Sequence, residues 1–242
     1  MPRGTIDDSN VLKESLVSAL SDVGELAVRL GAISSIDRTG DVFIATSFAD
    51  GFNVWQLNPS GANSHIRLSG QYSRSQGVCA RLRAGGAEDD FATLYAFIRN
   101  PLSGKLGVEL HFTYLTGWKE FILRLAHYVA GTLVDYQIKL DLANDNIYYL
   151  NDAGVFSLIG ILEFSAREAG EWQVIKLVCD LPNDAYWRLL VNDDAYDLEG
   201  YLPQSSASSP PDALLVEMKV VSSAITYADF FIDDILVTAN EI

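Results

Sequence analysis

The chain is 242 residues long, is 49% hydrophobic and carries a formal net charge of −15. That length suits one large β-rich domain with an appendage, or two small domains, and the composition excludes collagen-like and disordered chains. The charge argues against nucleic acid and anionic membranes as partners, because binding phosphates requires clustered Lys and Arg. No apolar run reaches the ~18 residues of a membrane span, and Met1–Asp8 lack the apolar core of a secretory signal. We therefore expect a chain that works in the cytoplasm, or that leaves by lysis or inside a larger assembly.

Residues 9–30 carry the clearest helical pattern. Asp7, Asp8 and Ser9 supply N-cap oxygens and negative charge at the start, and Gly31 supplies a stop. Apolar residues recur between them at alternating spacings of four and three, which defines a heptad seam: Leu12, Leu16, Ala19, Val23, Leu26 and Leu30. The sequence thus predicts an N-terminal amphipathic α-helix whose apolar stripe needs a partner.

Two interpretations of this helix remain open. It either pairs between subunits as a short parallel coiled coil, or docks on its own domain or on a neighbouring protein. Leu20 and Ala27 widen the stripe beyond a strict coiled-coil seam, which favours docking. On both interpretations residues 1–40 form an anchoring or oligomerisation arm. One assembly that we expect is a homo-oligomer, for instance a trimer.

From Asp41 onward the chain reads as β-structure. Apolar side chains alternate with polar ones in several runs, as half-buried antiparallel strands require. The runs place these residues on apolar faces: Leu106, Val108, Leu110, Phe112 and Tyr114; Val134, Tyr136, Ile138 and Leu140; Leu214, Val216, Met218 and Val220. Turn residues separate the runs, and no helix pattern follows. We predict an all-β fold for residues 41–242: a two-sheet antiparallel β-sandwich of the jelly-roll type.

The two cysteines, Cys79 and Cys179, give no metal cluster. Cys79 alternates onto the face of Arg81, whereas Cys179 shares the apolar face of Ile175 and Leu177. Because their facings differ, we expect two buried or half-buried thiols rather than a disulfide.

Five segments, in order, carry a family resemblance: residues 42–55, 72–82, 171–177, 186–193 and 230–237. The first contains Phe-Ala-Asp-Gly-Phe-Asn-Val-Trp, and the last contains an Asp-Asp pair. Together they resemble concanavalin A-like, laminin-G-like jelly rolls, although galactose-binding-like jelly rolls share several of these marks. Such domains with an added N-terminal arm also occur in tailed-phage virion proteins. There the resemblance implies a capsid-decoration, fibre or spike role, capsid or other assembly proteins as partners, and glycan binding.

The sequence shows none of the catalytic spacings that are local in a chain, whereas a Ser-His-Asp triad, whose members need not be close in sequence, stays open. Jelly-roll glycosidases carry two carboxylates at close spacing on one strand, but the glutamates here are isolated on their strands and are predicted to face solvent: Glu109, Glu120, Glu163 and Glu217. His65, His111 and His127 lack metal-ligand spacing, and His111 reads as an ordinary surface residue beside Glu109. We therefore predict that the protein is not an enzyme.

The resemblance also suggests binding sites. Related jelly rolls often hold calcium between the opening and closing strands, which makes Asp50, Asp233 and Asp234 the candidate ligands of Ca²⁺. We expect no other cofactor. The alternative is that Asp233 only bonds backbone amides. For glycans, Trp118 at a turn and Trp187 are the candidate stacking rings.

Three functions remain in competition. The leading one is a non-enzymatic virion-type structural protein, a capsid decoration or a spike or fibre component, found in the virion after assembly in the host cytoplasm. The alternative is a stand-alone carbohydrate-binding, lectin-like module, which would act outside the cell. The third is a polysaccharide-active glycosidase.

Overall fold

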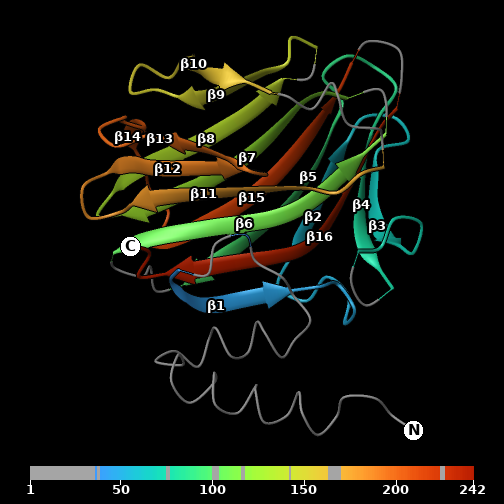
Figure 1. The fold of residues 1–242 in the computed structure, drawn as a ribbon, viewed down its shortest axis with the longest axis horizontal. Helices are drawn as coiled ribbons and strands as arrows, with labels where there is room; N and C mark the ends of the chain where they lie inside the picture. Colours follow the sequence, from blue (N-terminus) through green and yellow to red (C-terminus); the bar gives the residue numbers. More distant parts are fainter. Residues whose placement is uncertain are drawn as a thin grey trace, which may run out of the picture.

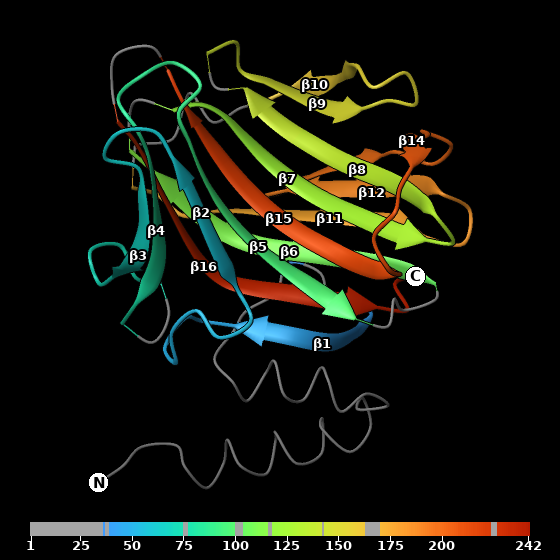
Figure 2. The ribbon, with the colours of Figure 1, turned by 180° about the vertical axis from the view of Figure 1, so that it is seen from behind.

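The computed structural model describes residues 36, 39–74, 77–99, 104–115, 118–141, 143–162, 170–223 and 227–242. All regular elements in these ranges are β-strands, and they form two antiparallel sheets packed face to face (Figures 1 and 2). The predicted all-β sandwich is confirmed. The heptad seam of residues 12–30 lies outside the described residues, so the helix and the arm boundary at residue 40 stay predictions. The described part of the chain contains no helix with the length and apolar character to cross a membrane.

Sheet A lies in front in Figure 1. Its strands, in spatial order, are β13 (Asp194–Asp197), β12 (Ala185–Val191), β11 (Gln173–Asp180), β6 (Lys105–Tyr114), β16 (Ala228–Ala239), β4 (Cys79–Ala84) and β3 (His65–Ser69), with β1 (Asp41–Thr46) paired to β16. Sheet B lies in front in Figure 2. Its order is β10 (Phe156–Ile161), β9 (Asn146–Leu150), β8 (Thr132–Asp141), β7 (Trp118–Val129), β15 (Ala213–Ser222), β5 (Phe91–Arg99) and β2 (Gln56–Ser60), with β14 (Gln204–Ala207) paired to β8.

The core fills the space between the sheets. The apolar positions predicted on β6, β8 and β15 point into it, and nearly all are fully buried. At its centre Phe112 of sheet A, Phe121 of sheet B and Phe230 of sheet A stack, with ring centroids 4.5–5.7 Å apart. Burying one such ring contributes roughly 2–3 kcal/mol. This cross-sheet stack fixes how the two layers pack, and hence the positions of residues on the outer faces.

Strand β16 connects three other strands of sheet A. It pairs with β6 along nearly its whole length, with β4 over Ala228–Ile232 and with β1 over Ile235–Ala239. A bulge between Asp233 and Ile235 marks the change of partner, and Asp234 there adopts a left-handed backbone with φ of 55°. The opening strand β1 and the closing strand β16 are therefore neighbours in sheet A.

The prediction for the cysteines is also confirmed. Cys79 and Cys179 are both buried and free. Asn192, with φ of 53°, turns the chain between β12 and β13.

The outer face of sheet A contradicts a further prediction. Glu109 and His111 of β6 were expected on a solvent-facing surface, but they are only 1% and 5% exposed. Two observations give the physical reason. The backbone N–H of Ile36, ahead of β1, donates a 3.0 Å hydrogen bond to Glu109, so the chain lies over this face. The face also contains the fully buried ion pair of Lys176 Nζ and Glu241 Oε1 at 2.8 Å. Gly107 makes room for that pair, because a Cβ there would lie 2.7 Å from the Glu241 oxygen.

Candidate functional site

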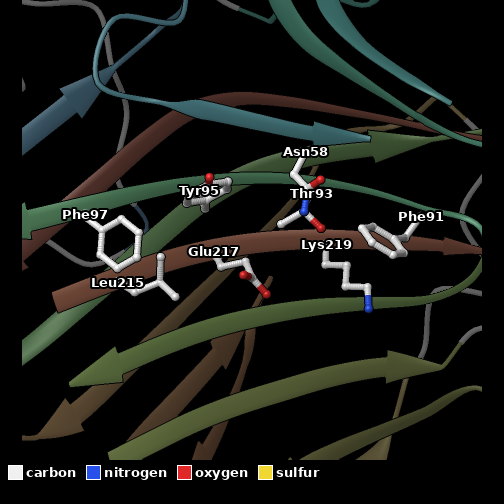
Figure 3. A pocket seen from close by; sticks show the side chains of 8 residues that line it. All are labelled: Asn58, Phe91, Thr93, Tyr95, Phe97, Leu215, Glu217 and Lys219. Carbon is white, nitrogen blue, oxygen red and sulfur yellow. The ribbon is translucent and has the colours of Figure 1, made fainter. Parts of the chain in front are cut away.

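The outer face of sheet B carries an open row of large side chains. On β5, Ala92, Leu94 and Ala96 are fully buried in the core, so the alternate residues point outward: Phe91, Thr93, Tyr95 and Phe97. On the neighbouring β15 the outward residues are Leu215, Glu217 and Lys219. The strand register places Leu215 opposite Phe97, Glu217 opposite Tyr95 and Lys219 opposite Thr93. Figure 3 shows the two rows side by side, with Asn58 of β2 beside Thr93.

These rows form the floor of a hollow of about 340 Å³. Its lining residues are Asn58, Phe91, Thr93, Tyr95, Phe97, Leu215, Glu217 and Lys219. A second hollow of about 650 Å³ adjoins it and is lined by Gln56, Phe97, Tyr128, Pro210, Pro211, Asp212 and Ala213. Phe97 lines both, so we treat the two as one groove, called the sheet B groove from here on.

Aromatic rings dominate the middle of the sheet B groove. Phe97 is 50% exposed, although it lies in the interior of a strand. Its ring centroid is 6.0 Å from that of Tyr95, edge to face, and 6.5 Å from that of Tyr128. An exposed aromatic ring in this setting loses hydrophobic stabilisation that burial would supply. A ligand that covered it would recover that stabilisation.

An ionic network flanks the rings. The Arg124 guanidinium on β7 donates two hydrogen bonds to Asp135, at 2.8 and 2.9 Å, and lies 3.8 Å from a Glu217 oxygen. Gln137 donates a further bond to Asp135 at 2.9 Å. Burial raises the pKa of Glu217, although Arg124 and Lys219 oppose that effect. Asp135 is therefore fully engaged, and Glu217 is the carboxylate that faces the groove.

The remaining cations of this face lie over rings. Lys219 Nζ is 4.5 Å from the centroid of Phe91, and Lys139 Nζ lies over Tyr148 and Phe156 at 4.8 and 4.4 Å. Lys139 also pairs with Glu120 at 3.6 Å. The cations Arg124, Lys139 and Lys219 thus lie beside the carboxylates Asp135, Glu120 and Glu217. Asp212, which lines the second hollow, adds a further negative charge to the groove.

The tryptophans predicted to bind glycan are not brought together in this groove. Trp187 lies on β12 of sheet A, half-buried, and Lys105 Nζ lies 3.2 Å from its ring centroid, so one ring face is already occupied. Its neighbour Tyr186 points into the core and donates a 2.9 Å hydrogen bond to the Leu150 carbonyl. Trp118 is the first residue of β7, opposite Ser222, and its side chain is outside what the structure describes.

The residues proposed for calcium are placed as follows. Asp233 and Asp234 are fully buried in the β16 bulge, where Asp233 accepts a bond from the Arg74 backbone at 2.9 Å and Asp234 pairs with the Arg74 guanidinium at 2.5 Å. Asp50 is exposed in the loop after β1. Over the ranges that the structure describes, no three His, Cys, Asp or Glu side chains are grouped as a metal site requires. Calcium stays a prediction, and the bonding of Asp233 to a backbone amide matches the alternative stated for it.

The sequence of β5 contains a pattern that indicates the groove. In Phe91–Phe97 the aromatic side chains fall on alternate positions, with Ala, Leu and Ala on the other side. A strand whose aliphatic residues point into the core and whose aromatic rings point outward is a candidate binding strand. The partners of β5 could not be assigned in the same way, because β2 and β15 lie far from it in sequence.

Comparisons with known proteins bear on the fold. No protein-family model and no curated protein match the sequence. Solved structures do match. The cellulose-induced protein Cip1 superimposes with a TM-score of 0.57 at 9% identity, over 83% of this chain and 99% of that one. A carbohydrate esterase of the Shiga toxin-encoding bacteriophage phi24B gives 0.52 at 16% identity, over 83% and 100%. The metal-free lectin I-B4 of Griffonia simplicifolia gives 0.50 at 12%, over 82% and 100%.

The chain therefore has the β-sandwich fold of the concanavalin A-like lectins and glucanases. That fold is shared by lectins and by a carbohydrate-active enzyme. Fold likeness at these identities does not transfer a function. Function has to be argued from the groove itself.

Proposed function

We propose that this protein binds carbohydrate in the sheet B groove, without catalysing a reaction on it. The observation that carries the proposal is the half-exposed Phe97 between Tyr95 and Tyr128. Sugar rings present C–H groups on their faces, which pack on the electron-rich faces of aromatic rings. Asn58, Thr93, Glu217 and Lys219 supply donors and acceptors for hydroxyl groups along the same floor. The acids Glu217 and Asp212 in the groove, in a chain of net charge −15, favour a neutral glycan over a polyanionic one.

The arrangement of acids favours binding over hydrolysis. Glycoside hydrolysis needs two carboxyl groups about 5 to 9.5 Å apart on either side of the scissile bond. The acids that line the groove are Glu217 in one hollow and Asp212 in the other. Each hollow thus has one acid in its described lining. Asp212 is also engaged, because it accepts a 3.0 Å hydrogen bond from the Ala130 backbone. Asp135, which lies beside Glu217, is held by Arg124 and Gln137.

A panel of immobilised polysaccharides and a glycan array test the proposal directly. We expect the wild-type protein to retain at least one neutral glycan, and Phe97→Ala to weaken that binding about tenfold or more, which corresponds to about 1.4 kcal/mol. Tyr227→Ala is the matched control, because Tyr227 is an exposed ring that lies outside the groove, over Arg83. Failure of the folded wild-type protein to bind any glycan of the panel would reject the proposal.

We also propose a second function, that of a virion-type structural protein. One observation favours it: Ile36 contacts Glu109 on sheet A, so the chain ahead of β1 leaves from the face opposite the groove. An arm formed by residues 1–40 that anchored the protein to other copies or to capsid proteins would then leave the groove pointing away from the assembly. Size-exclusion chromatography of the full chain and of a variant lacking residues 1–35 tests this. Identical monomeric elution of the two would count against an oligomerising arm.

A further inference from the structure

We infer that the ligand of the sheet B groove is an extended glycan chain that runs along β5 and crosses β15 toward β7, with sugar units on both sides of Phe97, and not a single terminal sugar. This inference rests on the proposed function and adds to it the form of the ligand. The observation behind it is that one ring, Phe97, forms part of the wall of two separate hollows.

The groove is longer than a single sugar. Each hollow, at about 340 and 650 Å³, is by itself of the size that holds a small-molecule ligand. Along β15 the floor runs from Lys219 to Ala213, which is about 20 Å of extended strand. That length is several times the length of one sugar ring. A monosaccharide would leave most of the lining rings uncovered.

The positions of the rings give the groove a direction. Tyr95 and Phe97 lie on β5, and the register places Leu215 opposite Phe97 and Glu217 opposite Tyr95. Tyr128 lies past Phe97 along the same direction, because it pairs with Ala213 at the far end of β15. Tyr95 and Phe97 therefore follow each other along β5, whereas Tyr128 lies on β7, on the other side of β15 and two positions further along it. A chain of sugars that stacks on all three rings runs along β5 and then crosses β15 obliquely.

The second hollow is ordered before a ligand binds. Its wall, Pro210 and Pro211, lacks backbone donors and has restricted φ angles. Hydrogen bonds on both sides hold this wall: Ser208 N donates to the Gly131 carbonyl at 2.8 Å, and Ala130 N donates to Asp212 at 3.0 Å. A site that is ordered before binding loses little entropy when it is filled. It is therefore ready to take sugar units beyond those in the first hollow.

The chemistry differs between the two sides of Phe97. The first hollow presents polar groups from Asn58, Glu217 and Lys219, whereas the second presents Tyr128 and two prolines with Asp212 and Gln56 at their edge. We expect hydroxyl-specific contacts in the first hollow and mainly stacking contacts in the second. The first hollow should set which sugar is bound, and the second should add affinity for longer chains.

The experiment is a length series measured by calorimetry. The probes are β-1,4-linked gluco- and galacto-oligosaccharides from the mono- to the octasaccharide, with the full-length protein. We expect affinity to rise about tenfold or more from the shortest bound member to the longest and then to level off once the groove is filled. Tyr128→Ala should remove this gain and leave the shortest bound member unaffected, while Phe97→Ala should weaken every length. Tyr227→Ala, outside the groove, should change nothing.

The outcomes separate the two proposals. If the monosaccharide binds as tightly as the octasaccharide, or if Tyr128→Ala leaves the gain with length intact, the extended-chain inference is overturned while glycan binding stands. If neither series nor any polysaccharide of the panel binds the folded protein, glycan binding itself is rejected, and the inference falls with it. A gain that is only proportional to length and insensitive to Tyr128 reflects the statistics of repeated units and also counts against the inference.

Discussion

The two outer faces of the sandwich have similar sequence patterns but differ in how far their charged residues are buried. On sheet A, charged residues such as Glu109 and Lys176 are buried and bonded to partners from distant parts of the chain. On sheet B, Glu217 and Lys219 line an open groove beside half-exposed rings. Both faces alternate polar residues with a buried apolar face. What separates them is whether another part of the chain lies on top, and that decides which face is structural and which is free to bind.

The largest expected effect comes from breaking the closed face. Lys176→Met removes the nearer of the two cations that pair with the buried carboxylate of Glu241, at 2.8 Å, and leaves Arg188 at 3.1 Å. A buried charge left with no partner costs about 3–5 kcal/mol, and we expect the lower end of that range because Arg188 remains. Urea denaturation followed by fluorescence should report that loss. Lys119→Met is the control, because Lys119 pairs with Glu88 and Asp89 in solvent, and it should leave the transition unchanged. A loss below about 1 kcal/mol in Lys176→Met would mean that sheet A is hydrated in solution.

The next effect is a pH dependence on the same face. Burial lowers the pKa of His111 to about 4, and the nearby Arg74 contributes in the same direction. Between pH 6.5 and 4 the unfolded chain binds a proton that the folded protein does not, so stability falls as the pH falls. The total is about 3 kcal/mol.

Other groups titrate in this window, and Glu217 with its raised pKa works in the opposite direction. The measurement is therefore the difference between wild type and His111→Gln across pH 4 to 7. We expect the variant to lack this component of the slope. Parallel curves would show that His111 is solvated in the folded protein.

A smaller effect is expected when the open face is changed. Phe97→Ala should alter the free energy of unfolding by less than about 1 kcal/mol, because the ring is half-exposed and only cross-strand contacts are lost. Phe230→Ala, in the stacked core, should cost about 3–5 kcal/mol in the same assay. A Phe97 variant as unstable as the Phe230 variant would mean that the ring serves the fold rather than a ligand.

The smallest effect concerns Glu217. Because burial raises its pKa, the ionised form is disfavoured in the folded protein, and the neutral isostere Glu217→Gln should be at least as stable as wild type at pH 7. We expect a gain within about 1 kcal/mol that shrinks as the pH is lowered and Glu217 itself takes up a proton. Denaturation at pH 7 and pH 5 measures both. A clear destabilisation at pH 7 would show that the contact of Glu217 with Arg124 outweighs its burial.

Local pattern was enough to predict the layers of the fold. The alternation in β6, β8 and β15 identified the buried side chains, because it depends on neighbouring residues in the sequence. The pairing of β1 with β16 joins segments nearly 200 residues apart, and local pattern could not predict it.

The candidate site could not be predicted in the same way. Glu109 and Glu217 have similar sequence surroundings, and their different environments depend on what packs over each sheet. Phe97, Tyr128 and Pro211 meet only because three strands and a loop, distant in sequence, come together in sheet B. Tryptophan was taken as the marker of a sugar site, but the described groove is lined by Phe and Tyr, which occur throughout the core as well.

The way β16 connects sheet A also has a consequence for how the protein is made. Its partners β1, β4 and β6 all come from the first half of the chain, so during synthesis they leave the ribosome well before β16 does. Until then their free edges stay unpaired, and contacts over such long sequence separations form slowly. We expect folding to finish only after translation of β16, and the yield of native protein to improve when expression is slowed by low temperature.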